Sequence, residues 1–249
     1  MRFNIYREAR LSLLILSIVI LISFAFCILA SMFTSMGYKG LRTESKDVII
    51  YDNNLPVIII DAGHGGEDPG AVDNGLTEKD LNLEFANILE KILSANGYKT
   101  YLTRSDDRLL YNTGEEKRKK YYDIRNRLEF ARRFDNAIFV SIHMNKFAAS
   151  YCEGFQAFYG DKNQSGKILA ECIQKSVLKL QTDNHRTIKN GKDTIFLLEN
   201  LEMPATLIEC GFISNSREAG LLKNGDYKLS LVMSIFCGIA NYMESNDEK

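Results

Sequence analysis

The length, composition and charge of this chain limit what kind of protein it is. Its 249 residues, 45% of them hydrophobic, are enough for one domain with a complete core. The 31 basic and 32 acidic residues leave a formal net charge of −1. No overall positive field therefore attracts nucleic acid, and we expect no nucleic-acid partner.

The first element is an apolar run without charges, Leu11 to Phe33. A helix rising about 1.5 Å per residue over this length crosses a hydrocarbon core of about 30 Å. The run therefore predicts a transmembrane signal anchor over residues 11–33, after a cytoplasmic tail over residues 1–10 and before a linker over residues 34–55. We expect the protein at the cell membrane, with a single span as its membrane contact and its main domain outside the cytoplasm. The alternative is cleavage of the segment and secretion.

Strands and helices alternate over residues 56–245, which we expect to form the main domain. Val57–Ile60, Ala137–Ile142 and Ala205–Ile208 are apolar runs typical of buried strands. The alternation predicts an α/β fold, a three-layer sandwich whose mostly parallel, twisted sheet is flanked by helices. Weaker patterns predict further strands over residues 48–51, 98–103, 154–159 and 194–198. Amphipathic patterns predict helices over residues 77–96, 124–134, 165–180 and 227–242.

Two shorter features are a predicted helix cap and a charged stretch. Thr77 is a suitable N-cap, and Asp80 at the third helical position resembles a capping box. The charged stretch Tyr111–Lys120 predicts a solvated loop or a helix start. The alternative for this stretch is a lid that contacts an anionic polymer.

Four cysteines follow the predicted span. An even number outside the cytoplasm permits disulfides. Because Cys210 and Cys237 lie in core-like apolar runs, free thiols are favoured. No C-x-x-C pair is present, so a cysteine zinc site is not expected. The cysteines are Cys152, Cys172, Cys210 and Cys237.

Polar residues follow three of the predicted strands. His64 lies in a glycine-rich turn after the first strand, His143 ends the second, and Glu209 follows the third. Ligands of α/β sheets bind at the carboxyl ends of strands. Glu78 begins a helix on the inward edge of its apolar stripe, where a buried carboxylate must be paired or metal-bound.

Each of these residues alone has an ordinary explanation. A histidine can be a hydrogen-bonded structural residue, Glu78 can interact with the helix dipole, and Glu209 can pair with Arg104 or Arg127. Together, however, two histidines and a glutamate meet the demand of catalytic zinc, which takes three protein ligands and leaves a place for water. The second glutamate is then a candidate general base.

Five motifs together resemble the zinc-dependent N-acetylmuramoyl-L-alanine amidase family. In chain order they are DAGHGGEDPGA, E-K-x-L-N-L, T-R-x-x-D, S-I-H-M-N and E-C-G-F-I-S-N, between Val57 and the C-terminus. The resemblance implies one Zn²⁺ ion bound by His64, Glu78 and His143, with Glu209 as the catalytic residue. It implies hydrolysis of the amide between the lactyl group of N-acetylmuramic acid and L-alanine.

Three further residues of these motifs are candidates to orient the ligands or their neighbours, namely Asp61, Arg104 and Asn145. Two features depart from the family pattern: Arg132 replaces a usual asparagine, and the Tyr111–Lys120 segment is longer than usual. The only other histidine, His185, lies in a polar stretch and is not assigned to the metal.

The resemblance also implies a substrate and partners. The substrate is a peptidoglycan glycan strand with its stem peptide, and an accessory activator protein is expected because the chain has no wall-binding repeats. The compact form is similar to germination-specific sporulation amidases, which implies a role in maturation of the spore cortex through muramic-lactam formation. The alternatives are a vegetative cell-wall amidase, a zinc peptidase acting within the stem, and a non-catalytic peptidoglycan-binding scaffold.

Overall fold

The computed structural model describes residues 55–162 and 164–247. The predicted tail, the predicted span over residues 11–33, the strand over residues 48–51 and almost all of the predicted linker lie outside these residues. The division of the chain at these boundaries stays a prediction.

The predicted localisation, a single-pass protein of the cell membrane, is wrong: the described residues contain no helix that fits it. None of the described helices is both long and apolar enough to cross a membrane. The longest of them, α7 (Gly225–Asp247), instead places its apolar residues Leu231, Ile235 and Ile239 in the core.

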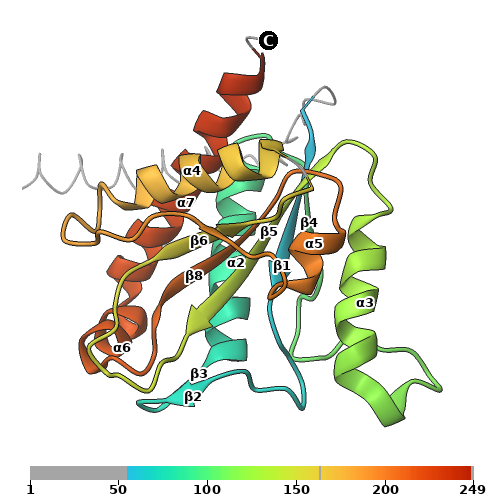
Figure 1. Cartoon of the computed structure of the whole chain (residues 1–249), viewed down its shortest axis with the longest axis horizontal. Coiled ribbons are helices and arrows are strands. Elements are labelled where there is room, and N and C mark those ends of the chain that lie inside the picture. The colour runs from blue at the N-terminus through green and yellow to red at the C-terminus, as the bar shows by residue number, and fades with distance from the viewer. Residues whose placement is uncertain (1–54, 163, 248–249) are drawn as a thin grey trace, which may run out of the picture. The chain divides into compact units, whose positions relative to one another are not determined.

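Six strands form one sheet in the order β4-β1-β5-β8-β6-β7 (Figure 1). Neighbouring strands are parallel except for β6, which runs antiparallel to β8. The sheet is therefore mostly parallel, as predicted. A separate antiparallel pair joins β2 to β3. The strands are β1 (Val57–Ala62), β2 (Val72–Asp73), β3 (Leu76–Thr77), β4 (Thr100–Leu102), β5 (Ala137–Asn145), β6 (Gln156–Tyr159), β7 (Lys189–Asn190) and β8 (Ala205–Phe212).

Helices pack on both faces of the sheet and form the predicted three-layer sandwich (Figure 1). Successive residues of a strand point to opposite faces. Ile58 and Ile60 therefore pack in the larger core with α2, α4 and α7, whereas Ile59 packs in the smaller core with α3 and α5. The remaining elements are α2 (Glu78–Ala95), η1 (Glu116–Arg118), α3 (Lys119–Ala131), α4 (Gln164–Val177), α5 (Phe196–Asn200) and α6 (Ser216–Lys223).

Three local expectations were wrong or incomplete. The segment expected as a strand over residues 194–198 is the helix α5, which turns Leu197 and Leu198 into the smaller core. Thr77 is extended and makes no side-chain capping bond, because it pairs with Val72 in the β2–β3 ribbon. Helix α6 was not predicted, although Asn215 caps it by accepting from two backbone N–H groups.

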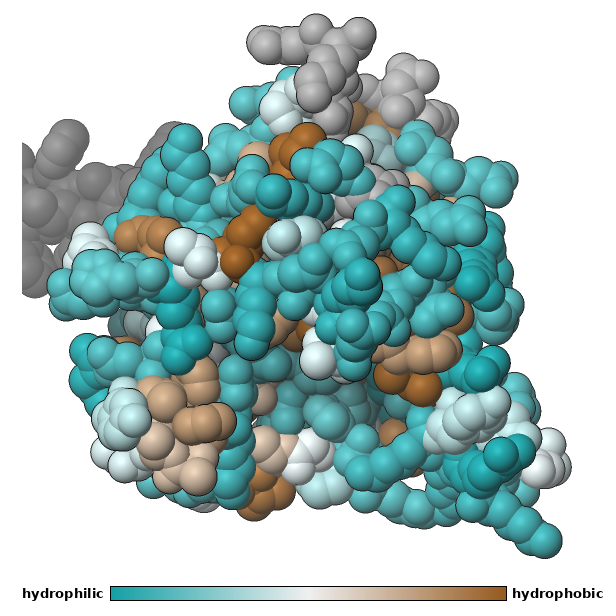
Figure 2. Space-filling model, viewed as in Figure 1, coloured by the Kyte–Doolittle hydropathy of each residue, from teal (hydrophilic) through white to brown (hydrophobic). Residues whose placement is uncertain are grey.

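The surface and the cysteines agree with a single well-packed domain for the described residues. The face seen in Figure 2 is mostly hydrophilic, and its hydrophobic residues form small separate patches. Cys152, Cys172, Cys210 and Cys237 are free, as favoured from the sequence. Burial raises the pKa of the Cys210 thiol well above its usual range, so this cysteine is inert.

The packing of α7 on α4 generates a stability prediction. A Cβ added at Gly238 would lie 2.4 Å from the Cα of Ile173, so the two helices would have to move apart. Gly238→Ala should therefore lower the free energy of unfolding by about 1–3 kcal/mol, measured by urea denaturation of the full chain. In the control Gly220→Ala, the new Cβ meets no described atom within 4 Å. A helical glycine replaced in open space should stabilise by about 0.5–1 kcal/mol, so equal effects would contradict the prediction.

Candidate metal centre

The carboxyl ends of three adjacent parallel strands bring the candidate residues together. His64 follows the end of β1, His143 lies near the end of β5, and Glu209 lies on β8 directly opposite His143 in the strand register. Glu78 opens α2, which begins beside this edge of the sheet. The structure thus places four residues from separate parts of the sequence at one end of the sheet.

His64, Glu78 and His143 form a compact group of ligand atoms. Glu78 Oε1 lies 3.2 Å from His64 Nε2 and 2.8 Å from His143 Nδ1, and one ligand atom from each residue lies within 4.8 Å of the others. Ligand atoms of a tetrahedral site with bonds of about 2.0–2.1 Å lie about 3.3 Å apart. Both the donor types and their spacing therefore fit a divalent cation such as zinc.

The backbone leaves little room around these ligands. Glu78 Oε2 accepts a hydrogen bond from the N–H of Ala71 at 2.7 Å, which fixes the carboxylate. A Cβ at Gly70 would lie 2.5 Å from Glu78 Oε2 and 2.7 Å from His64 Cδ2. Gly70 also has a φ of +65°, so only glycine suits this position.

A carboxylate that was not predicted orients His64. Asp68 Oδ2 lies 2.8 Å from His64 Nδ1, and Asp68 Oδ1 in turn pairs with Lys120 at 2.6 Å. A ligating histidine commonly donates its second nitrogen to a carboxylate, which fixes the ring and its tautomer. With Nδ1 held in this way, Nε2 is the nitrogen that faces Glu78.

The charges of the group are strongly coupled. Burial alone would lower the pKa of His64, but the hydrogen bonds and charges of Glu78 and Asp68 raise it to about 9. Burial alone would raise the pKa of Glu78, but His143 and His64 hold it far below its usual range. A metal ligand must be deprotonated, so binding of a cation here would release protons.

Glu209 differs from Glu78 because one of its carboxylate oxygens has no hydrogen-bond partner among the described residues. Its Oε2 atom is buried and bonds to no described group, and neither Arg104 nor Arg127 pairs with it. Burial raises the pKa of Glu209 to about 7, which the charge of His143 only partly offsets. A carboxyl group with a pKa near neutrality beside a potential metal site has the properties of a general base.

Buried Arg127 holds the turn that presents His64. Its Nη1 donates to Asp61 Oδ1 at 2.6 Å and to the carbonyl of Ala62 at 2.7 Å, and its Nη2 donates to the carbonyl of His64 at 2.7 Å. Its Nε donates to Asp123 Oδ2 at 2.9 Å. One side chain from α3 thereby fixes the end of β1 and the turn that follows it.

Arg104 joins this turn to the helix of Glu78. It donates to the carbonyls of Ala62 at 2.9 Å, Gly63 at 3.0 Å and Lys79 at 2.7 Å. The carbonyl of Lys79 belongs to the first turn of α2. A second buried arginine therefore holds the turn of His64 and the helix of Glu78 in a fixed relation.

Asp61 balances the buried positive charge. Burial would raise its pKa, but Arg127 and hydrogen bonds from Ser141 and Thr103 lower it below the usual range. The hydroxyls donate at 2.6 Å from Ser141 and 2.7 Å from Thr103. Asp61 therefore ties together the end of β1, the middle of β5 and the residue after β4.

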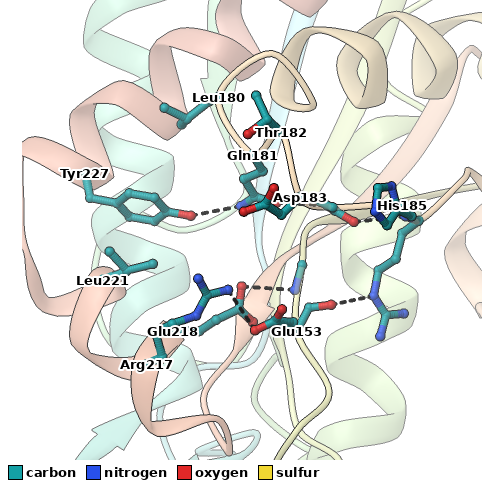
Figure 3. Close-up of a pocket in the computed structure, with 13 residues that line it drawn as sticks. Glu153, Leu180, Gln181, Thr182, Asp183, His185, Arg217, Glu218, Leu221 and Tyr227 are labelled. Carbon is teal, nitrogen blue, oxygen red and sulfur yellow. Dashed lines mark hydrogen bonds and ion pairs between the residues drawn. The ribbon is translucent and has the colours of Figure 1, made fainter.

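Two polar residues named from the sequence remain. Asn145 contributes a backbone carbonyl that accepts from Ile213 at 2.9 Å, and its role in orienting the ligands or their neighbours stays a prediction. His185 lines a cavity of about 430 Å³ beside α6 and α7 rather than the ligand group (Figure 3). Sequence reasoning missed Asp68 and the role of Arg127. The spacing of Asp68 four residues after His64 was the available signal.

Comparisons with known proteins agree with one another. The family model described as N-acetylmuramoyl-L-alanine amidase matches residues 58–241. The germination-specific N-acetylmuramoyl-L-alanine amidase of Bacillus subtilis (strain 168) is 34% identical over 188 residues, which are 75% of this chain and 79% of that protein. The sporulation-specific N-acetylmuramoyl-L-alanine amidase of the same organism is 32% identical over 190 residues, 75% and 66% of the two chains.

A solved structure gives the same likeness. The CwlD amidase from Clostridioides difficile, solved in complex with the GerS lipoprotein, matches with a TM-score of 0.73 and 37% identity. The match covers 76% of this chain and 99% of that one. The likeness therefore extends over the whole of the domain described above.

The arginine network generates a second prediction. Arg127→Met should lower the free energy of unfolding by about 3–5 kcal/mol, because it leaves the buried charges of Asp61 and Asp123 without their partner. The measurement is chemical denaturation of the full chain. The control Arg132→Met removes an exposed arginine paired with exposed Glu129 and should change stability by less than about 0.5 kcal/mol. Similar losses in both variants would show that the buried network does not hold the fold.

Proposed function

We propose, on the premise that this chain belongs to the N-acetylmuramoyl-L-alanine amidase family, that one Zn²⁺ ion held by His64, Glu78 and His143 serves its activity. Family membership gives the reaction: hydrolysis of the amide that joins N-acetylmuramic acid to L-alanine in peptidoglycan. The observation that carries the proposal is the meeting of three ligand atoms beside an unpaired glutamate at one sheet edge.

The roles of the chain's own residues follow from their surroundings. When bound, Zn²⁺ supplies Lewis acidity, which polarises the scissile carbonyl and makes a water more acidic. Glu209 accepts the proton of the attacking water as the new C–O bond forms. It then donates that proton to the nitrogen of L-alanine as the C–N bond breaks. Asp68, Arg104 and Arg127 orient the ligands and the turn that carries His64.

The biological setting is a finer part of the proposal. We place the reaction in maturation of the spore cortex, where removal of stem peptides precedes muramic-lactam formation needed for germination. The likeness to the germination-specific and sporulation-specific amidases supports this setting. A vegetative cell-wall substrate is the alternative. Muropeptide profiles of spores lacking the protein separate the two, because only the first setting predicts loss of muramic lactam.

An accessory activator protein is a further part of the proposal. The similar CwlD amidase was solved together with a lipoprotein, which supports a protein partner for this chain as well. Full activity of the purified protein on spore-type wall, without any addition, would contradict this part alone.

Metal content gives the third prediction. The purified full chain should bind about one Zn²⁺ per molecule. His64→Ala should lose most of this zinc, because only two of the three protein ligands would remain and two ligands bind zinc weakly. The measurement is metal analysis after dialysis against a fixed free-zinc concentration. The control His185→Ala removes the histidine outside the ligand group and should keep full occupancy. Equal loss of zinc from both variants would contradict the ligand assignment.

Turnover gives the fourth prediction. Glu209→Gln should keep its zinc but lose at least about a hundredfold in kcat/KM on purified peptidoglycan, since general acid–base catalysis contributes typically 10²–10⁴-fold. Mass analysis of the products should show intact stem peptides that begin with L-alanine. Shorter peptides would instead indicate cleavage within the stem. Retained turnover in Glu209→Gln would remove Glu209 as the base.

The pH dependence of kcat/KM gives the fifth prediction. Glu209 acts as a base only when it is ionised, and burial raises its pKa to about 7. The charge of a nearby cation favours the ionised form and lowers this pKa, so kcat/KM should fall as pH decreases through a value somewhat below 7. A profile that stays level down to the ordinary glutamate pKa of about 4.3 would contradict the prediction.

A further inference from the structure

Arg186, in the loop between α4 and β7, is fixed by contacts at both its backbone and its side chain. Its N–H donates to Asn184 Oδ1 at 2.9 Å, and its carbonyl accepts from Gln174 Nε2 at 3.0 Å. Its Nε donates to the carbonyl of Glu153 at 2.7 Å, and its Nη1 donates to Gln156 Oε1 at 3.0 Å. The guanidinium is therefore preorganised in the protein without a ligand.

The charge of this guanidinium is not neutralised by its surroundings. Its contacts are to a backbone carbonyl, to an amide oxygen and to the ring of Phe212, whose centroid lies 4.7 Å away. Among the described residues no carboxylate pairs with Arg186, and none accepts from its Nη2. The neighbouring Arg217, in contrast, pairs with the carboxylate of Glu153 at 2.7 Å. A rigid, half-buried cation with only neutral partners is suited to bind an anion.

The sheet register places this cation beside the proposed base. Gln156 lies directly opposite Glu209 in the antiparallel β6–β8 pair. Residues opposed in this way lie on the same face, with Cβ atoms about 5 Å apart. The guanidinium of Arg186 donates a hydrogen bond to the side chain of Gln156. It therefore lies beside the end of the sheet that carries Glu209.

The guanidinium is also within reach of a ligand. Arg186 borders the cavity of about 430 Å³ between the loop after α4 and helices α6 and α7. Figure 3 shows Glu153 and Arg217 joined on one side of this cavity and Tyr227 bonded to Gln181 on the other. These neighbours pair with one another, whereas no carboxylate among the described residues pairs with Arg186 at the cavity edge.

We propose that Arg186, oriented by Gln156, binds a carboxylate of the stem peptide on the leaving-group side of the scissile amide. This inference rests on the proposed amidase function. Two extended residues span about 7 Å, so the carboxylate carried by the second stem residue is the one within reach when L-alanine lies at Glu209. The planar guanidinium matches a carboxylate with two parallel hydrogen bonds. The substrate class is thus an acidic peptide joined to a muramoyl group.

The test compares two synthetic substrates that differ in one group. Both are N-acetylmuramoyl-L-alanyl-D-glutamic acid, one with the α-carboxylate free and one with it converted to a carboxamide. The zinc-loaded full chain should cleave the free acid with a kcat/KM about ten to a hundred times higher. Arg186→Gln should remove this preference, because kcat/KM on the free acid should fall to the value measured on the carboxamide. Arg186→Lys should restore only part of the preference, since it lacks the fork geometry.

The control is Arg217→Gln, which removes the neighbouring ion-paired arginine and should keep the full preference. An equal rate of the wild type on both substrates would overturn the inference and leave the amidase function standing. Equal loss on both substrates in Arg186→Gln would also overturn it, because that pattern indicates a purely structural role.

Binding of the leaving peptide is a readout that does not need turnover. Calorimetry with L-alanyl-D-glutamic acid should detect binding to the wild type that is lost with the α-carboxamide and in Arg186→Gln. This result would support the inference even if no substrate were cleaved. Absence of cleavage would count against the proposed function instead. Equal binding of acid and amide would overturn the inference.

Discussion

The buried ion pair of Arg127 with Asp61 is the constraint on which the candidate site depends. Both side chains are almost wholly removed from water, so each charge needs close partners. Arg127 finds them in two carboxylates and two carbonyls, and Asp61 finds them in one arginine and two hydroxyls. These bonds join α3 to β1, to β5 and to the residue after β4. They therefore fix the positions of the strands that carry the candidate site.

The same network holds His64 in an unusual backbone conformation. His64 has a φ of +61°, which costs a non-glycine residue of the order of 1 kcal/mol. Arg127 donates to the His64 carbonyl, and the ring Nδ1 of His64 bonds to the carboxylate of Asp68; these two bonds hold the residue there. The ring is thereby turned toward Glu78 and His143, with which it forms a group that could hold a metal ion. The strain is local and lies at the place where chemistry is proposed.

Two glutamates at this sheet end have opposite properties because their neighbours differ. Two histidines surround Glu78 and hold its pKa low, so it stays ionised and suits a metal ligand. The Oε2 atom of Glu209 is buried without a hydrogen-bonding partner among the described residues, and the pKa of Glu209 is raised toward neutrality. Carboxyl groups whose environments separate their pKa values divide ligand and base roles between them. The strand register places Glu209 opposite His143, which in turn bonds to Glu78. The register therefore sets how far Glu209 lies from Glu78.

The sequence predicted most of the sheet because its central strands are buried on both faces and are continuous apolar runs, such as Val57–Ile60. The short run Ile195–Leu198 was misjudged, because four apolar residues fit a strand or a helix equally well. Arg127 was missed as a support, since an arginine in a charged helix normally faces solvent. Its partner Asp61 lies 66 residues earlier, and only the tertiary fold brings them together. The motif residues at strand ends were found because parallel strands place their carboxyl ends at one edge.

The most direct test of the account is a crystal structure of the zinc-loaded protein with anomalous scattering measured at the zinc edge. The account predicts one strong peak bonded to His64, Glu78 and His143 at about 2.0–2.2 Å, with Glu209 near the metal but not bonded to it. A peak elsewhere, or a peak ligated by Glu209 in place of Glu78, would contradict it.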